Sequence, residues 1–261
     1  MLLEINDIDI SYGDQLAVQD FSLKLDEGQI CSLVGESGSG KTTVIRAVLG
    51  LLPGSGKVTK GDILYEGKSL LEYSTKEWRD LRGSEISMIF QDSGAMMNPT
   101  KKIGKVFVEY ICTHKNVSKA EAWDMGVTML EKMRLPDGDN IMNSYPFQLS
   151  GGMRQRVGIA MAMTFRPKLL LADEPTSALD VTIQAQIVRQ MVELVSEYGT
   201  SIIIVTHNLG VAAYMSDHLV VMRMGRIEDE GNRDYILHDS DNEYTRELLA
   251  AVPSIGGERY V

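Results

Sequence analysis

The chain has 261 residues, of which 44% are hydrophobic, and its formal net charge at pH 7 is −10. This acidic balance argues against nucleic acid as the main partner, because binding its phosphates requires clustered lysine and arginine. The apolar residues occur in runs well short of the roughly 20 that span a bilayer, and the sequence opens without a basic, apolar leader. We therefore expect a folded, soluble chain that reaches a membrane only through partners.

The first 30 residues alternate polar and apolar side chains, most clearly over residues 3–10 and 21–25. Such alternation is typical of half-buried antiparallel strands. We predict an antiparallel β subdomain in this region.

A glycine-rich run, GESGSGKT, occupies residues 35–42 and fits the pattern G-x-x-x-x-G-K-[ST]. It lies between a strand-like stretch at 30–34 and a helical pattern over 41–51, which is the context that the motif requires. Glycines permit a tight curl that turns backbone N–H groups toward phosphates, and the helix adds the positive end of its dipole. An accidental glycine-rich turn is the alternative, and the flanking strand and helix disfavour it.

This run predicts a nucleotide site. Lys41 is expected to contact the β- and γ-phosphate oxygens, and the Thr42 hydroxyl to hold Mg²⁺. Thr43 is more simply a helix residue, and it is included because it directly follows Thr42. The candidate nucleotide-binding residues are Gly35, Glu36, Ser37, Gly38, Ser39, Gly40, Lys41, Thr42 and Thr43.

Pro53 and Gly54 should end the helix after the phosphate-binding run. The Gly/Ser/Lys-rich residues up to Gly61 predict a loop, followed by a strand at 62–65.

Helical spacing replaces strand patterns in the middle of the chain. It is visible over residues 106–114, 120–133 and 151–165. We predict that residues 92–165 form an inserted helical lobe.

The run LSGGMRQ occupies residues 149–155 in that lobe. Ser150 resembles a helix N-cap, and Gly151 and Gly152 leave backbone N–H groups open to the close approach of an anion. The run is therefore a second candidate phosphate site.

An apolar run at residues 168–172 ends in Asp173 and Glu174. This pattern is typical of a buried parallel strand that delivers carboxylates to one edge of a sheet. We predict that Asp173 binds Mg²⁺, directly or through a water, and that Glu174 polarises the attacking water. A solvated acidic turn is the alternative, and the upstream phosphate-binding run disfavours it.

A second β-branched run, residues 201–206, directly precedes His207. Ligands of open α/β sheets gather at the carboxyl edge of the strands. We predict that a neutral His207 hydrogen-bonds the γ-phosphate and orients Glu174 and the water. The other histidines have no such context and are interpreted as surface residues: His114, His218 and His238.

Residues 217–227 predict a terminal hairpin, and 244–251 a last amphipathic helix. By resemblance to other proteins with this phosphate-binding run, we assign residues 1–91 and 166–235 to a RecA-like core that includes the antiparallel β subdomain, and 236–261 to a short C-terminal helix and tail.

Together, these motifs resemble the nucleotide-binding subunit of ABC transporters, whose signature sequence is matched by LSGGMRQ. The resemblance implies an α/β P-loop NTPase of the ABC type that hydrolyses ATP with Mg²⁺. It also implies that two subunits sandwich ATP, so that the signature of one subunit meets the γ-phosphate held by the other. The signature residues assigned to the nucleotide are Ser150, Gly151, Gly152 and Gln155.

Three further positions follow from the resemblance. Tyr12 matches the aromatic residue that stacks on adenine, although an ordinary strand-end tyrosine is the alternative. Gln91 matches the Q-loop glutamine, which contacts Mg²⁺ and the water and links the core to the transmembrane partner. Residues 177–180, SALD, match the D-loop, in which Asp180 helps to build the partner's site.

Four stretches resemble, more narrowly, the dipeptide, oligopeptide and nickel importers: residues 91–99, 145–163, 173–187 and 243–253. The last is the most informative, because it lies outside the catalytic core. The chain departs from that family's pattern at Ser93, at Asn242-Glu243 and at Asn208. The first departure bears on the surface offered to the membrane subunit, and the other two do not affect catalysis.

This narrower resemblance implies two transmembrane permease subunits, a second, related ATPase subunit and, indirectly, an extracellular or periplasmic solute-binding protein. The chain would lie at the cytoplasmic face of the cell membrane and transport peptides, nickel or metal chelates. A heterodimer with the related ATPase is favoured, and a homodimer remains open. The contrasting class is a soluble ABC ATPase without a transport role, although the chain has neither a second cassette nor a long heptad insertion.

Sulfur-containing residues give a few smaller expectations. Met96 and Met97 follow Gln91 and predict an adaptable apolar surface for a partner helix. Cys31 and Cys112 have no metal-ligand spacing and are interpreted as small core residues. No cysteine follows Cys112, so an iron–sulfur tail is not expected.

Overall fold

The computed structural model describes residues 1–261 except 178, 252–253, 256–257 and 260–261. Its contacts divide the chain into a first unit, residues 1–77 and 199–261, and a second unit, residues 78–198. The assigned D-loop residue at 178 and the assigned tail positions 252–253, 256–257 and 260–261 lie outside the described residues.

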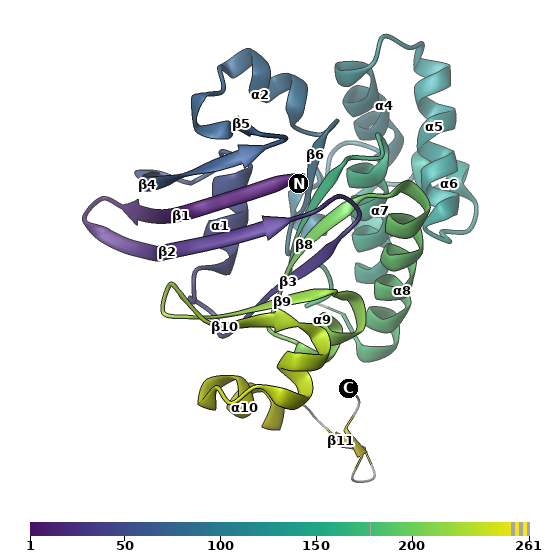
Figure 1. The fold of residues 1–261 in the computed structure, drawn as a ribbon. Coiled ribbons are helices and arrows are strands. Elements are labelled where there is room, and N and C mark those ends of the chain that lie inside the picture. Colours follow the sequence, from purple (N-terminus) through teal and green to yellow (C-terminus); the bar gives the residue numbers. More distant parts are fainter. Residues whose placement is uncertain (178, 252–253, 256–257, 260–261) are drawn as a thin grey trace. The chain divides into compact units, whose positions relative to one another are not determined.

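The first unit begins with a four-stranded antiparallel sheet in the order β2-β1-β4-β5 (Figure 1). The polar/apolar alternation of the sequence becomes alternate burial along most of β1 and β2, and the antiparallel sheet confirms the predicted β subdomain. The strands are β1 Leu3–Tyr12, β2 Gln15–Leu25, β4 Gly56–Tyr65 and β5 Lys68–Ser69.

Strand β4 corrects one expectation. Residues 56–61 were predicted as loop, yet they pair with the end of β1, where Tyr12 faces Gly56 and Asp9 faces Lys60. The register shifts between Asn6 and Asp9, and Gly61 has φ +76 at this irregularity. A glycine-rich stretch therefore forms a strand here because it accommodates a bulge.

A second set of strands in the first unit has the order β10-β9-β3-β8. Strand β3, Ile30–Val34, runs parallel to β8, Ser201–Thr206, and to β9, His218–Arg223, whereas β10, Arg226–Asn232, returns antiparallel to β9. Strands β3 and β8 are buried along their whole length, as their unbroken apolar sequences predict. The predicted terminal hairpin is confirmed as β9 and β10.

Helices of the first unit are short. They are α1 Lys41–Val48, α9 Leu209–Met215 and α10 Glu243–Ala250, with a 3-10 turn at Leu70–Glu72 and a π-helical turn at Tyr235–Asp239. Two short strands, β11 Ser254–Ile255 and β12 Glu258–Arg259, pair antiparallel. Helix α2, Thr75–Leu81, contains the division between the two units.

The second unit combines two parallel strands with helices. Strand β6, Ile86–Ile89, pairs with β7, Leu169–Asp173, and the sequence did not single out β6. The helices are α3 Ser93–Met96, α4 Ile103–His114, α5 Lys119–Lys132, α6 Gly138–Asn143, α7 Gly151–Met163 and α8 Val181–Tyr198, with a 3-10 turn at Pro146–Gln148.

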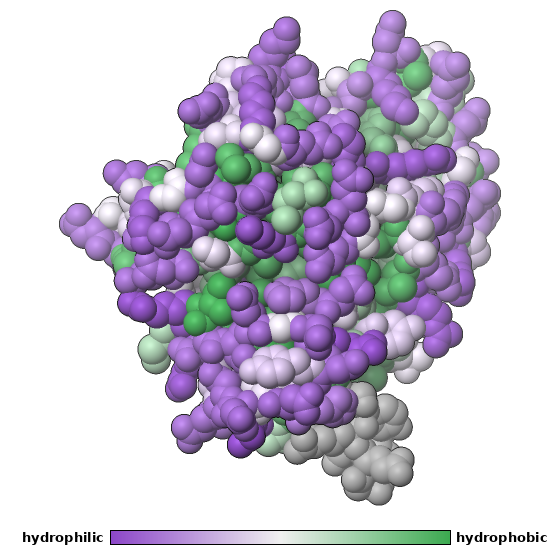
Figure 2. All heavy atoms as spheres, viewed as in Figure 1, coloured by the Kyte–Doolittle hydropathy of each residue, from purple (hydrophilic) through white to green (hydrophobic). Residues whose placement is uncertain are grey.

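Helices α4, α5 and α7 confirm the three helical patterns read from the sequence, and Figure 1 shows α4, α5 and α6 grouped together. Helix α5 begins with a capping box, in which Ser118 and Glu121 satisfy each other's backbone N–H groups. No helix of the described residues is long and apolar enough to cross a membrane. The face shown in Figure 2 is mostly hydrophilic, with apolar residues in small groups.

The sulfur-containing residues divide between core and surface. Cys31 is buried in β3, where burial raises the pKa of its thiol, as expected for a core residue. Cys112 is exposed on α4, so its assignment to the core was wrong. Met96 is 65% exposed but Met97 only 8%, so only Met96 can contribute to the expected apolar surface.

Candidate functional site

The phosphate-binding run in the first unit is a tight loop between β3 and α1. Gly35 has φ +148, and an added Cβ would lie 2.1 Å from the Met222 carbonyl oxygen. Gly40 has φ +99 and is the N-cap of α1. Because an L side chain would be strained or would clash at both positions, glycine is required for this curl.

Lys41 lies inside this loop. Its side-chain Nζ donates to the carbonyl oxygens of Gly35, at 2.7 Å, and Glu36, at 2.6 Å, and to Ser39 Oγ at 3.1 Å. The residue is only 5% exposed, so the ammonium is fixed at the centre of the loop. A charged donor in this position can exchange carbonyl partners for phosphate oxygens.

The start of α1 supplies the backbone part of an anion site. Its N-cap, Gly40, has no side chain with which to satisfy the first N–H groups of the helix. Thr42 and Thr43 occupy the first turn and are half-buried. Gly225 donates its N–H to the Ser39 carbonyl at 3.1 Å, which ties the loop to the β9–β10 turn. A helix start of this kind favours phosphate.

His207 directly follows β8. Strand β8 is the neighbour of β3, which leads into the phosphate-binding loop. Val34 faces Thr206 in the parallel register of β3 and β8, so the loop and His207 emerge at the same edge. His207 is exposed, and Asn208 caps α9 by accepting from the Val211 N–H at 3.2 Å. The departure at Asn208 therefore preserves a helix cap.

Tyr12 ends β1 and is half-buried. Its ring lies so close to Gly56 that an added Cβ there would be 2.6 Å from the tyrosine Cε1. It stays a predicted adenine contact in the first unit.

The second unit holds the acidic residues on a turn after β7. Asp173 is 3% exposed at the strand end, and Glu174 has φ +43. This conformation is unusual for a residue with a side chain, and still more so before a proline, so the turn must be held by its surroundings.

Hydrogen bonds hold the carbonyls of Glu174 and of the next residue, Pro175. Ser177 donates its N–H and its hydroxyl to the Glu174 carbonyl, each at 3.2 Å, and Gln155 Nε2 donates to the Pro175 carbonyl at 2.7 Å. Gln91 Nε2 donates to Glu174 Oε2 at 3.2 Å. The predicted base and the Q-loop glutamine are thus brought together, since β6 and β7 are parallel neighbours with Ile89 facing Ala172.

Among the assigned signature residues, Gln155 contacts the acidic turn. Its side chain is 6% exposed and bonded to the turn. Its assignment as a nucleotide ligand stays a prediction.

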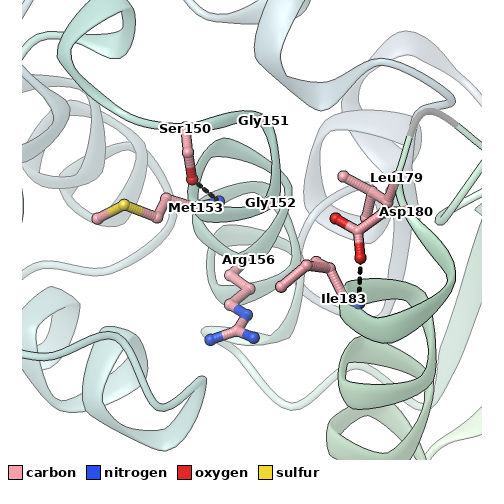
Figure 3. A pocket seen from close by; sticks show the side chains of 8 residues that line it. All are labelled: Ser150, Gly151, Gly152, Met153, Arg156, Leu179, Asp180 and Ile183. Atoms are coloured by element: carbon pink, nitrogen blue, oxygen red, sulfur yellow. Dashed lines mark hydrogen bonds between the residues drawn. The ribbon is translucent and has the colours of Figure 1, made fainter.

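The signature forms one wall of a hollow of about 340 Å³ in the second unit (Figure 3). Ser150 caps α7 by accepting from the Met153 N–H at 3.3 Å, and Asp180 caps α8 by accepting from the Ile183 N–H at 3.0 Å. Two helix starts therefore face the same space. Its lining residues are Ser150, Gly151, Gly152, Met153, Arg156, Leu179, Asp180 and Ile183.

Arg156 lines this hollow, although the sequence did not single it out. Its Nη2 donates to Gln186 Oε1 at 2.9 Å, and Figure 3 shows its side chain below Ser150 and Gly152. It adds a fixed cation to a space already lined by the signature glycines, which suits an anionic ligand. In the sequence, the only indication that Arg156 belongs to this site was its position directly after Gln155.

The chain is similar over most of its length to proteins of the family that its motifs resemble. The ABC transporter family pattern matches residues 18–177. The oligopeptide transport ATP-binding protein OppD of Bacillus subtilis is 45% identical over 259 residues, which are 97% of this chain and 72% of the relative. OppD of Salmonella typhimurium is 43% identical over 99% of this chain and 78% of its own length.

Solved structures agree. A dimeric ATP-binding cassette in a post-hydrolysis state, bound to ADP and Pi, matches with a TM-score of 0.79 at 26% identity, over 89% of this chain and 99% of its own. The cbiO1 protein of Clostridium perfringens, part of an ABC transporter complex, matches with a TM-score of 0.79 at 26% identity, over 97% and 96% of the two chains. The predicted ABC-type α/β fold is confirmed, and the chain belongs to the ABC transporter family as one of its ATPase subunits.

Proposed function

We propose that this ATPase subunit powers the import of peptides through a membrane permease. The observation that carries the proposal is the similarity of 97% or more of the chain to proteins named for oligopeptide and dipeptide transport. The sequence resemblance also left nickel or a metal chelate open as the transported cargo. The soluble ABC ATPase without a transport role is not favoured.

The working form is a dimer in which each ATP meets a phosphate loop of one subunit and a signature of the other. Two features support this arrangement. The chain carries both elements, and a helix begins at each of them, α1 at the phosphate loop and α7 at the signature, so that its N-terminus suits phosphate. The second subunit is a related ATPase or a second copy of this chain. Two permease subunits would hold the pair at the cytoplasmic face of the membrane, and a solute-binding protein would deliver cargo from outside.

The donor atoms assigned to Mg²⁺ fit that ion. The Thr42 hydroxyl, the Asp173 carboxylate and the Gln91 amide oxygen are hard oxygen ligands of the kind that Mg²⁺ prefers. When bound, Mg²⁺ would neutralise charge on the phosphate oxygens.

Glu174 takes the role of general base. Its carboxylate would align the attacking water, and the Gln91 amide 3.2 Å away would fix the orientation of that carboxylate. His207 would donate a hydrogen bond to the γ-phosphate, and Lys41 would stabilise the charge on the β- and γ-phosphates.

Trapping in native membranes tests the assembly. The Glu174→Gln chain is tagged, loaded with ATP and purified from detergent-solubilised membranes of its own cell, and the bound proteins are identified by mass spectrometry. Two multi-span proteins with a second ATPase are expected. Recovery of soluble partners alone would overturn the transport role.

Uptake measurements test the cargo. Cells lacking this chain should lose uptake of labelled di- to pentapeptides, and the wild-type chain but not Glu174→Gln should restore it. Unchanged peptide uptake with lost nickel uptake would move the assignment to metal.

A further inference from the structure

The C-terminal helix α10 makes a direct contact with the phosphate loop. The Tyr244 hydroxyl accepts a hydrogen bond from the backbone N–H of Glu36 at 3.2 Å. Glu36 is the second residue of the loop, and Tyr244 lies 208 residues later in the chain. One loop amide is thus held by a side chain outside the ATP-binding motifs.

Tyr244 is itself fixed by packing. It is 4% exposed, and the Arg223 guanidinium lies over its ring, 4.7 Å from the centroid. It belongs to a buried cluster with Val34, the last residue of β3 before the loop, and with Leu249 of the same helix. Helix α10 is therefore packed against the base of the loop.

The start of α10 fixes the direction of Tyr244. Asn242 caps the helix by accepting from the Thr245 N–H at 3.0 Å, and its own amide donates to the Glu228 carbonyl at 2.9 Å. The buried Thr245 hydroxyl donates to Asp229 Oδ2 at 2.8 Å. Because two neighbours of Tyr244 are anchored to β10, the helix has little freedom to rotate its tyrosine away from the loop.

We propose that Tyr244 is a positioning residue for the phosphate loop, through which nucleotide affinity depends on the docking of α10. The proposal rests on the assigned binding of ATP at residues 35–42. It gives a physical reason for the C-terminal motif that begins at Glu243: the helix preorganises the loop whose amides meet phosphate. By linkage, ATP in the loop stabilises the docked helix by the same factor.

The Tyr244→Phe substitution tests the proposal, because it removes the hydroxyl and keeps the ring in the core. Equilibrium binding of a fluorescent ATP analogue to the full chain should weaken by about 3- to 10-fold, the range expected for one net hydrogen bond. The kcat of hydrolysis at saturating ATP should stay at the wild-type value. Tyr214→Phe is the matched control, since Tyr214 is 59% exposed on α9, and its affinity should not change.

Hydrogen exchange supplies a readout that lost packing alone would not move. ATP should slow exchange of the α10 amides in the wild-type chain, and this protection should fall in Tyr244→Phe. A second variant, Arg223→Gln, removes the cation over the ring and should weaken binding in the same direction by less. Wild-type ATP affinity in Tyr244→Phe, whatever its melting temperature, would overturn the proposal.

Discussion

The phosphate loop and the acidic turn are both short connections after a buried strand, yet they are shaped by different forces. In the loop, Gly35 and Gly40 adopt conformations that a side chain would resist, and the Lys41 ammonium fills the centre. In the turn, Glu174 adopts a left-handed conformation although it has a side chain, and the amides and hydroxyls of other residues hold it there.

The two segments differ in backbone conformation because they present different chemical groups to the nucleotide. The loop presents backbone N–H groups, so residues without side chains serve it best. The turn must present one carboxylate in one direction, so it keeps the side chain and accepts backbone strain of about 1–3 kcal/mol. Hydrogen bonds from Ser177 and Gln155 offset that strain.

Removing the carboxylate should break the function of the turn and leave the loop intact. For Glu174→Gln we expect a fall in hydrolysis of roughly 10²–10⁴-fold, the usual effect of a lost general base. Phosphate release measures the rate, and equilibrium ATP binding should be unchanged because Lys41 and the loop amides are untouched.

The matched control is Glu193→Gln, an exposed glutamate that pairs with Arg134 at 2.8 Å on the surface. It should hydrolyse ATP normally. Near wild-type turnover in Glu174→Gln would assign the role of base to another residue.

Adding one methyl group should break the loop and leave the turn intact. In Gly35→Ala the new Cβ would lie 2.1 Å from a carbonyl oxygen of Met222, so the backbone must shift. We expect ATP affinity to fall by roughly 10- to 100-fold, because backbone strain of this kind costs free energy that binding must supply. Isothermal titration with ATP measures it.

Gly28→Ala separates the effect of backbone strain from the effect of a steric clash. Gly28 has φ +71, but nothing lies within 4 Å of its added Cβ. This variant should lose some thermal stability and keep its ATP affinity. Equal losses of affinity in both variants would mean that the loop is not the sensitive element.

The same difference explains which parts could be predicted from the sequence. The loop, strands β3 and β8 and the helical lobe were predicted because glycine spacing and hydrophobic periodicity are local. Residues 56–61 were mispredicted as loop because their partners in β1 are far away in the sequence: Tyr12 and Gly56, which pair, are 44 residues apart.

The contacts of the turn could not be predicted from the sequence for a similar reason. Gln91 and Glu174 are 83 residues apart, and Gln155 and Pro175 are 20 apart. The sequence placed Gln155 with the nucleotide because it follows the signature glycines. Only the packing of α7 against the turn reveals its contact with the Pro175 carbonyl.

Gln155→Met decides between these two roles of Gln155. Methionine fills a similar buried volume but cannot donate to the Pro175 carbonyl, so the turn should loosen and kcat should fall about 10-fold. If Gln155 positions the turn, the KM for ATP stays constant. If it is a nucleotide ligand, KM rises and kcat is kept.

Gln184→Met is the control for the Gln155 variant. The Gln184 amide donates to the Thr176 hydroxyl at 3.0 Å, a side chain of the same segment, and not to the carbonyl of Glu174 or Pro175. Its effect on kcat should be smaller. Steady-state kinetics across ATP concentrations distinguish the outcomes.

Ser177→Ala should give the smallest effect, because it removes one of the two bonds to the Glu174 carbonyl and leaves the backbone N–H of the same residue in place. We expect kcat to fall about 2- to 5-fold, less than a full hydrogen bond is worth. The double variant with Gln155→Met should lose more than the product of the two single effects, since the two residues hold successive carbonyls, those of Glu174 and Pro175, in one strained turn. Simple multiplication of the two effects would mean that each bond acts alone and that the turn does not store the strain as a unit.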